Sequence, residues 1–105
     1  MLIVNIDHLP GKQYEVLGLV RGSVVLSKNF GKDFLSAMKT LVGGEITAYT
    51  ELLNEARQIA MGRMVKDAEA QGANAVLNMR FASSSLMQSA AEVIAYGTAV
   101  RILEE

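Results

Sequence analysis

Residues 47–77, TAYTELLNEARQIAMGRMVKDAEAQGANAVL, decide the fold of this chain. Apolar side chains recur through residues 47–71 at the three- and four-residue spacing of one helix face: Tyr49, Leu52, Leu53, Ala56, Ile59, Ala60, Met64 and Ala68. Gly72 follows, where a helix commonly ends on a left-handed residue, and the apolar Val76 and Leu77 come soon after it. The segment predicts one long amphipathic helix that leads into a strand.

The segments on either side of this helix predict the remaining elements. Residues 14–20 and 24–26 are apolar runs around Gly22, which indicates one bent strand or a pair of strands. Both faces of 14–20 are apolar, so we expect the sheet to be covered twice, and a neighbouring subunit is our candidate for the second cover. Residues 75–81 and 92–103 predict two further strands, joined through a polar connection at 82–85, and residues 1–8 predict a short strand or arm.

Two features concern helices. Residues 29–42 predict a short helix that Asn29 caps and that ends at Gly43 and Gly44. The long helix has about 24 residues, hence a length of about 36 Å, which exceeds a strand of ordinary length, so we expect it to cross or overhang the sheet. Gly62 in its middle costs about 1 kcal/mol relative to Ala, which close backbone packing or a slight kink would explain.

Composition predicts a single domain over 1–105 that self-associates. The apolar residue types make up 50% of the 105 residues, and the nine glycines raise this share to about 59%. Soluble domains usually have roughly 45–50% of these types. A small monomer cannot bury such an excess, whereas identical subunits can cover the faces and edges of each other's sheets. We therefore expect a homo-oligomer.

Charge and cysteine content narrow the function classes. The formal net charge is -1 and the basic residues are scattered, so we expect no nucleic-acid partner. The chain has no Cys, which excludes thiolate metal sites and thiol nucleophiles and fits a reducing compartment, with the cytoplasm as the default location. Residues 1–8 are too short and too polar for a signal-peptide core or a transmembrane span, and we expect no membrane partner.

The chain resembles the YbjQ-like family of small uncharacterised bacterial and archaeal proteins, labelled "putative heavy-metal-binding". The segments that carry the resemblance are Leu17-Gly18 with Gly22-x-Val24-Val25, Asn29-Phe30-x-x-Asp33, Val42-Gly43-Gly44 followed by Tyr49, Glu55-Ala56-Arg57, Gly72-Ala73-Asn74-Ala75-Val76 and Gly97-Thr98-Ala99-Val100. The resemblance implies an α+β fold: a two-layer, dodecin-like β-α-β-β subunit with an antiparallel sheet packed on one long helix. It also implies a homopentameric ring. The residues themselves leave the cofactor unknown, and a metal ion is suggested by the resemblance alone.

The sequence offers few residues for a metal site. A common family pattern places acidic residues after the Gly72–Ala75 segment, and here Asn78, Arg80 and Ala82 stand there. His8 is a weak metal candidate, because a ring could bring several copies together, although a lone His is more often a surface residue. The six methionines could bind Cu(I), but methionine at these positions more often fills a core or an interface.

Polar residues after the long helix are the candidate ligand-binding groups: Asn78, Arg80, Ser83, Ser84 and Ser85. A ring would repeat them and concentrate their donors and positive charge, although the serine run is also typical of a solvated turn. Arg57 fits an ion pair between subunits, and the Asn74 amide is expected to bond local backbone groups.

We expect a non-enzymatic ring that binds a small ligand or a metal ion. The alternative is a structural or adaptor ring whose outer surface binds a protein partner, which an exposed apolar patch on the assembled ring would favour. An enzyme is the third and least favoured hypothesis. Acid-base chemistry would need titratable groups from several subunits to converge, and the sequence has few candidates beyond His8, Glu15 and Glu92.

Overall fold

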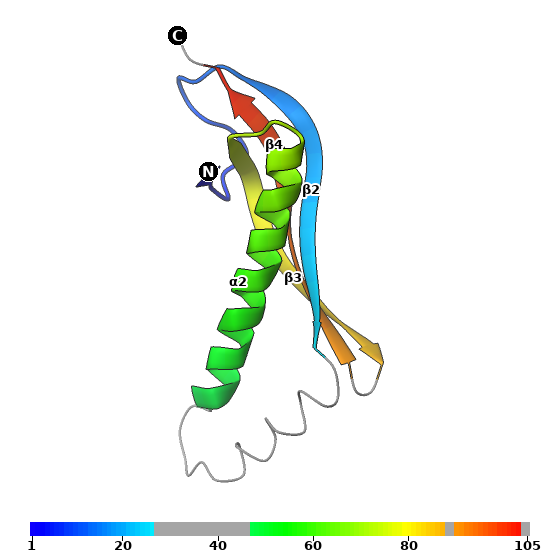
Figure 1. Cartoon of the computed structure of the whole chain (residues 1–105). Coiled ribbons are helices and arrows are strands. Elements are labelled where there is room, and N and C mark those ends of the chain that lie inside the picture. The colour runs from blue at the N-terminus through cyan, green and yellow to red at the C-terminus, as the bar shows by residue number, and fades with distance from the viewer. Residues whose placement is uncertain (27–46, 88–89, 104–105) are drawn as a thin grey trace.

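The computed structural model describes residues 1–26, 47–87 and 90–103 (Figure 1). The predicted short helix at 29–42 lies outside these residues. The described elements follow one another as β1 (Leu2–Ile3), β2 (Tyr14–Leu26), α2 (Thr47–Ala70), β3 (Ala75–Met87) and β4 (Ala90–Ile102). The long helix and the three main strands that the sequence predicts are therefore confirmed.

The four strands form one mixed sheet in the order β1-β3-β4-β2. β4 runs antiparallel to both β3 and β2, as predicted, whereas β1 runs parallel to β3. The prediction of a wholly antiparallel sheet is therefore wrong at one edge. The N-terminal segment continues along β3 beyond β1, because the Val4 N–H donates to the Val76 carbonyl at 3.0 Å and the Asn78 N–H donates to the Ile6 carbonyl at 2.8 Å.

Residues 14–26 form one long strand, which confirms the first of the two alternatives for this region. The register against β4 shifts between Val16 and Gly18, and Gly18 has a φ of 142°, a value that side chains disfavour. Gly22 has a different role, since a Cβ atom there would lie 2.3 Å from the Ala60 carbonyl oxygen. Glycine at position 22 therefore lets the backbone of α2 approach the backbone of β2.

α2 packs on the sheet through a stripe of three alanines and one methionine. Ala56, Ala60, Met64 and Ala68 are at most 2% exposed and form one core with Val20 of β2 and with residues of β3 and β4. α2 lies mainly over β2 and β4, and much less over β3. Ile59, predicted to belong to the buried stripe, is 39% exposed, so in the single chain this part of the prediction is wrong.

The helix ends as the sequence predicts. Gly72 has a φ of 85°, its N–H donates to the Glu69 carbonyl at 3.0 Å, and the Ala73 N–H donates to the Ala68 carbonyl at 3.0 Å. These two bonds form a Schellman motif, in which a left-handed residue turns the chain and satisfies the last carbonyls of the helix. The turn places Ala75 at the start of β3.

The subunit is elongated. β2, β3 and β4 have 13 residues each, which corresponds to about 43 Å of strand, more than the length of about 36 Å for the 24-residue helix. The expectation that the helix is longer than the strands is therefore wrong. The radius of gyration is 17.0 Å, against about 13 Å for a compact chain of this size. Figure 1 shows α2 diverging from the sheet toward its N-terminal end.

The strands exceed their predicted length because β3 continues through the serine run. Ser83, Ser84 and Ser85 pair with Val93, Glu92 and Ala91 of β4. The interpretation of residues 82–85 as a turn is therefore wrong. Strand pairing outweighs the weak local preference of serine for turns, because the ladder satisfies the backbone groups along the whole segment.

Candidate functional site

The sheet has one face under α2 and one face that α2 does not cover, which we call the outer face. A Cβ atom at Gly22 would point toward α2, so Arg21 and Ser23, the residues before and after it on β2, lie on the outer face. Residues that pair with them on β4 and β3 lie on the same face. On β2, β4 and β3 the outer face carries three cross-strand rows: Arg21–Tyr96–Arg80, Ser23–Ile94–Ala82 and Val25–Glu92–Ser84.

Part of the outer face is apolar and open to solvent. Val16, Leu19 and Val25 of β2 are 65%, 71% and 53% exposed. Toward the N-terminal end of β3 the same face is covered by Leu9, which packs in a separate buried cluster with Ala75, Leu77 and Val100. The N-terminal segment therefore covers one end of the outer face, and β2 leaves three large aliphatic side chains exposed beside it, with Arg21 and Ser23 between Leu19 and Val25.

The five predicted ligand-binding residues all lie on β3, but on different faces. Arg80 and Ser84 belong to the outer face, whereas Ser83 and Ser85 alternate onto the face that α2 packs against. Asn78 occupies a bulge with a φ of 54°, and its N–H bonds the N-terminal segment. The structure therefore does not bring the five together within one subunit, because strand pairing replaces the predicted turn.

Metal ligands are sparse in the single chain. His8 lies exposed in the N-terminal segment, and the described ranges contain no group of three or more His, Cys, Asp or Glu side chains able to hold a metal ion. Met64 is fully buried, and Met61 and Met79 pack against the same core. These three methionines therefore fill the core of the described structure, as methionine commonly does in irregular apolar gaps.

A groove lies between α2 and the neighbouring strands β3 and β4. It has a volume of about 190 Å³ and is lined by Leu53, Arg57, Phe81, Ala82, Ser83 and Val93. Arg57 donates to the Asn54 side chain at 3.1 Å, one helical turn earlier. Of the predicted site residues only Ser83 reaches this groove. Leu53 and Arg57 are four residues apart, so their sequence spacing already predicts that they lie on one face of the helix and could line the same groove.

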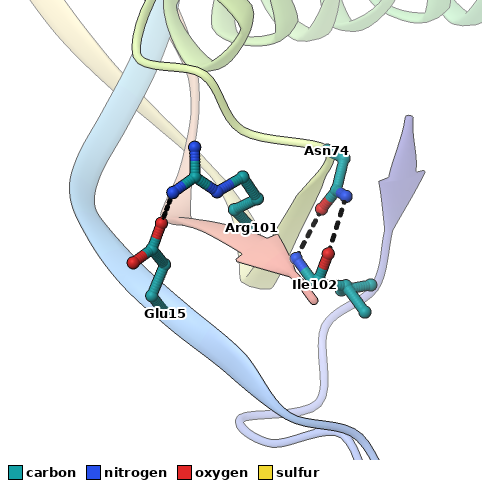
Figure 2. A network of polar contacts seen from close by, with 4 residues as sticks. All are labelled: Glu15, Asn74, Arg101 and Ile102. Carbon is teal, nitrogen blue, oxygen red and sulfur yellow. Dashed lines mark hydrogen bonds and ion pairs between the residues drawn. The ribbon is translucent and has the colours of Figure 1, made fainter. Parts of the chain in front are cut away.

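Two polar contacts at the other end of the sheet are structural (Figure 2). The Asn74 side chain donates to the Ile102 carbonyl at 3.1 Å and accepts from the Ile102 N–H at 2.7 Å. The expectation of local turn bonds for Asn74 is therefore wrong, since the amide binds the end of β4 in the way a strand residue would. Glu15, one of the candidate titratable groups, forms an ion pair with Arg101 on the neighbouring strand.

Side chains of α2 occupy the free edge of β2. The Arg63 guanidinium donates to the Ser23 carbonyl at 2.5 Å, and the Arg21 N–H donates to the Asp67 carboxylate at 3.3 Å. Both backbone groups point away from β4, so they would otherwise be available to another strand. β2 is therefore protected from strand addition at this point, in the way that edge strands are commonly blocked.

The chain is similar to a family of bacterial proteins over nearly its whole length. The model of the YbjQ family, described as "Putative heavy-metal-binding", matches residues 1–103. A UPF0145 protein of Clostridium novyi is 60% identical over 103 residues, which cover 98% of this chain and 100% of that protein. A UPF0145 protein of Clostridioides difficile is 59% identical over 106 residues, covering 100% of this chain and 94% of the relative. A UPF0145 protein of Thermotoga petrophila is 53% identical, covering 97% of each chain.

The fold is also found among solved structures. One example is the crystal structure of a DUF74 family protein of unknown function from Pediococcus pentosaceus, with a TM-score of 0.68 over 98% of each chain. At 13% sequence identity this likeness concerns the fold alone. In the described part of this chain, no helix is both long and apolar enough to cross a membrane.

Proposed function

Because this chain belongs to the YbjQ family, we propose that it is a non-enzymatic protein that assembles into a homopentameric ring of dodecin-like subunits and binds a small ligand there. The observation that carries the proposal is the exposure of three large aliphatic side chains, Val16, Leu19 and Val25, on the outer face. Water contact with three large aliphatic side chains along one strand is unfavourable, and a second copy of the chain would remove it.

The surface area of the subunit supports two contacts per chain. Its accessible surface is 7223 Å², whereas a compact monomer of 11.3 kDa has about 5,700 Å². The excess is about 1,500 Å², close to what one partner buries in two ordinary interfaces of about 800 Å² each. Each subunit of a closed ring makes two interfaces, and two contacts of this size would cover the excess.

The positions of the exposed apolar residues support a head-to-tail contact. Val16, Leu19 and Val25 lie on the outer face, whereas Ile59 on α2 and Phe81 on the helix side of β3 are 39% and 41% exposed. A twofold dimer uses one patch that complements itself, whereas a ring joins two different patches. We infer that the outer face of one subunit packs against the exposed side of α2 near Ile59 of the next.

The ligand is expected at polar groups that the ring repeats. Arg80 lies beside Tyr96 and Arg21 in one row of the outer face, and Ser84 lies beside Glu92 two rows away. Five copies would gather donors and positive charge around one axis. A heavy metal is a poorer fit to the donors of one chain, and would need the His8 side chains of several subunits to meet.

The remaining expectations belong to the same proposal. A ring with a ligand but without converging acid, base and nucleophile would be a binding protein, and we propose that it acts in the cytoplasm without a nucleic-acid or membrane partner. A protein partner is the competing proposal, which the apolar outer face favours if it stays exposed in the assembly.

Native mass spectrometry with elemental analysis of the same sample tests the assembly and its cargo. We expect a pentamer in the parent protein and a smaller species in Leu19→Ser, since Leu19 is 71% exposed in the single chain. Leu103→Ser is the matched control, because Leu103 is 44% exposed but lies beyond the last strand. A monomeric parent protein would overturn the ring.

The retained mass decides between the two proposed roles. A small molecule retained in stoichiometric amount would support the ligand-binding ring. A metal ion retained in stoichiometric amount would instead support a metal site formed by His8 side chains of several subunits. An empty pentamer that captures a defined protein through its apolar surface would favour the adaptor. Loss of the bound molecule in the Arg80→Ala, Ser84→Ala variant would support the outer face as the site, and unchanged affinity would contradict it.

A further inference from the structure

The groove beside α2 exists because the helix does not cover all of the sheet. α2 lies over β2 and β4, so it leaves the helix side of β3 beyond Met79 largely uncovered. Phe81 and Ser83 alternate onto this side of β3, and Val93 of β4 forms the neighbouring wall. The result is a half-open space between a helix and a strand with both apolar and polar lining.

Arg57 places a positive charge at this groove that the rest of the described chain does not neutralise. Its neighbours one turn away on α2 carry no carboxylate: Leu53, Asn54, Ala60 and Met61. None of the six residues that line the groove is acidic, and the described partner of the guanidinium is the neutral Asn54 side chain. Arg63 and Arg101, by contrast, are held by partners on the sheet. An unneutralised guanidinium presents paired donors that match a carboxylate.

The other walls suit a compact apolar group. Val93 is 6% exposed and forms the buried side, while Leu53 and Phe81 offer aliphatic and aromatic surface. An apolar cavity of about 150 Å³ can hold benzene, and this groove has about 190 Å³. The space therefore admits one ring-sized group with a small polar substituent.

We propose that the groove binds a small organic carboxylate with an apolar body the size of one aromatic ring. Arg57 holds the carboxylate, the Ser83 hydroxyl donates a further hydrogen bond to it, and the body lies against Leu53, Phe81 and Val93. The inference rests on the proposed function in taking the protein for a ligand-binding one, and it adds the chemical class of the ligand and a site on the helix side of the sheet.

Benzoate is the probe, and benzyl alcohol of similar shape is the neutral comparison. Binding is followed on the full-length protein by ligand-detected NMR, and amide shifts in ¹⁵N spectra locate the site. We expect shifts at Ser83 and Val93, and an affinity for benzoate about tenfold or more above that for benzyl alcohol. Arg57→Gln should remove this preference, while Arg57→Lys, which keeps the charge and loses the planar fork, should reduce it partly.

Lys66→Gln is the matched control, because it removes an exposed cation from the same helix at a residue that does not line the groove. It should leave benzoate binding unchanged. Absence of benzoate binding to the parent protein, equal binding by Arg57→Gln, or shifts confined to the outer face would each overturn the proposal. So would loss of binding in Lys66→Gln but not in Arg57→Gln.

The subunit count, measured on the same samples, separates this inference from the proposed ring. A pentamer that ignores benzoate overturns the carboxylate site and leaves the ring standing. A monomer that binds benzoate through Arg57 does the reverse. If Arg57→Gln falls apart into single chains, Arg57→Lys and Phe81→Ala are tested on the intact assembly, and full benzoate binding by both would overturn the site.

Discussion

Gly22 is the position where a single methyl group should be most damaging. A Cβ atom there would lie 2.3 Å from the Ala60 carbonyl oxygen, 2.3 Å from the Met64 nitrogen and 2.7 Å from the Arg63 carbonyl carbon. All three are helix backbone atoms, so no side chain can rotate away. Ordinary contact begins at 3.4 Å, and α2 would therefore have to withdraw from β2 by about 1 Å.

That withdrawal determines the expected cost of Gly22→Ala. The helix meets the sheet through Ala56, Ala60, Met64 and Ala68, which are at most 2% exposed, and a gap of 1 Å forfeits about a quarter to a half of each dispersion contact. Overpacking a core usually costs about 1–3 kcal/mol. Because the obstacle here is rigid backbone, we expect about 3 kcal/mol, which lowers the melting temperature by more than about 10 °C.

Gly62→Ala is the matched control and should have the opposite sign. A Cβ atom at Gly62 meets nothing within 4 Å, so the same substitution adds helix propensity without a clash. We expect a gain of about 0.8–1.0 kcal/mol. Denaturant unfolding followed by far-UV circular dichroism measures both variants, at one protomer concentration because association contributes to apparent stability.

Two results would refute this reasoning. If Gly22→Ala unfolds within about 0.5 kcal/mol of the parent protein, the close approach of α2 and β2 does not exist in solution. If Gly62→Ala is less stable than the parent, another chain lies against α2 at Gly62, so the contact proposed at Ile59 extends along the helix to this position.

Three further predictions concern the sheet. Asn74→Ala should lower the free energy of unfolding by about 1–3 kcal/mol in denaturant unfolding, because it removes both hydrogen bonds to Ile102. Asn74→Asp should lower it by only part of this amount, because Asp keeps the acceptor for the Ile102 N–H and loses the donor. Gly97→Ala should cost about 1–3 kcal/mol in the same assay, because the new Cβ would lie 2.6 Å from Val76 Cγ1, and an additional Val76→Ala change should recover part of the loss. Arg101→Gln should cost less than about 1 kcal/mol, because the pair with Glu15 is half exposed, and a larger effect that persists in high salt would contradict this.

Within the candidate site, the sequence identified residues better than it placed them. It singled out Arg57, Arg80 and Ser83 by their chemistry, but placed Arg80 near the end of a strand and Ser83 in a turn after it. Pairing with β4 turns residues 80–85 into a strand, and the two-residue alternation of a strand then sends Arg80 and Ser83 to opposite faces. The groove walls Phe81 and Val93 were missed for the same reason, since which β3 residues α2 leaves uncovered depends on how the helix lies across the sheet.

The sequence by itself determined the elements whose causes are local. The spacing of apolar residues specifies α2, Gly72 ends it through its left-handed backbone, and the apolar runs specify the strands. Only the tertiary structure decided the parallel pairing of β1, the continuation of β3 through the serines, the bond from Asn74 to Ile102 and the contact of Gly22 with the helix backbone. These four join residues far apart in the chain, and their energies depend on strand register and interlayer distance, which no local pattern encodes.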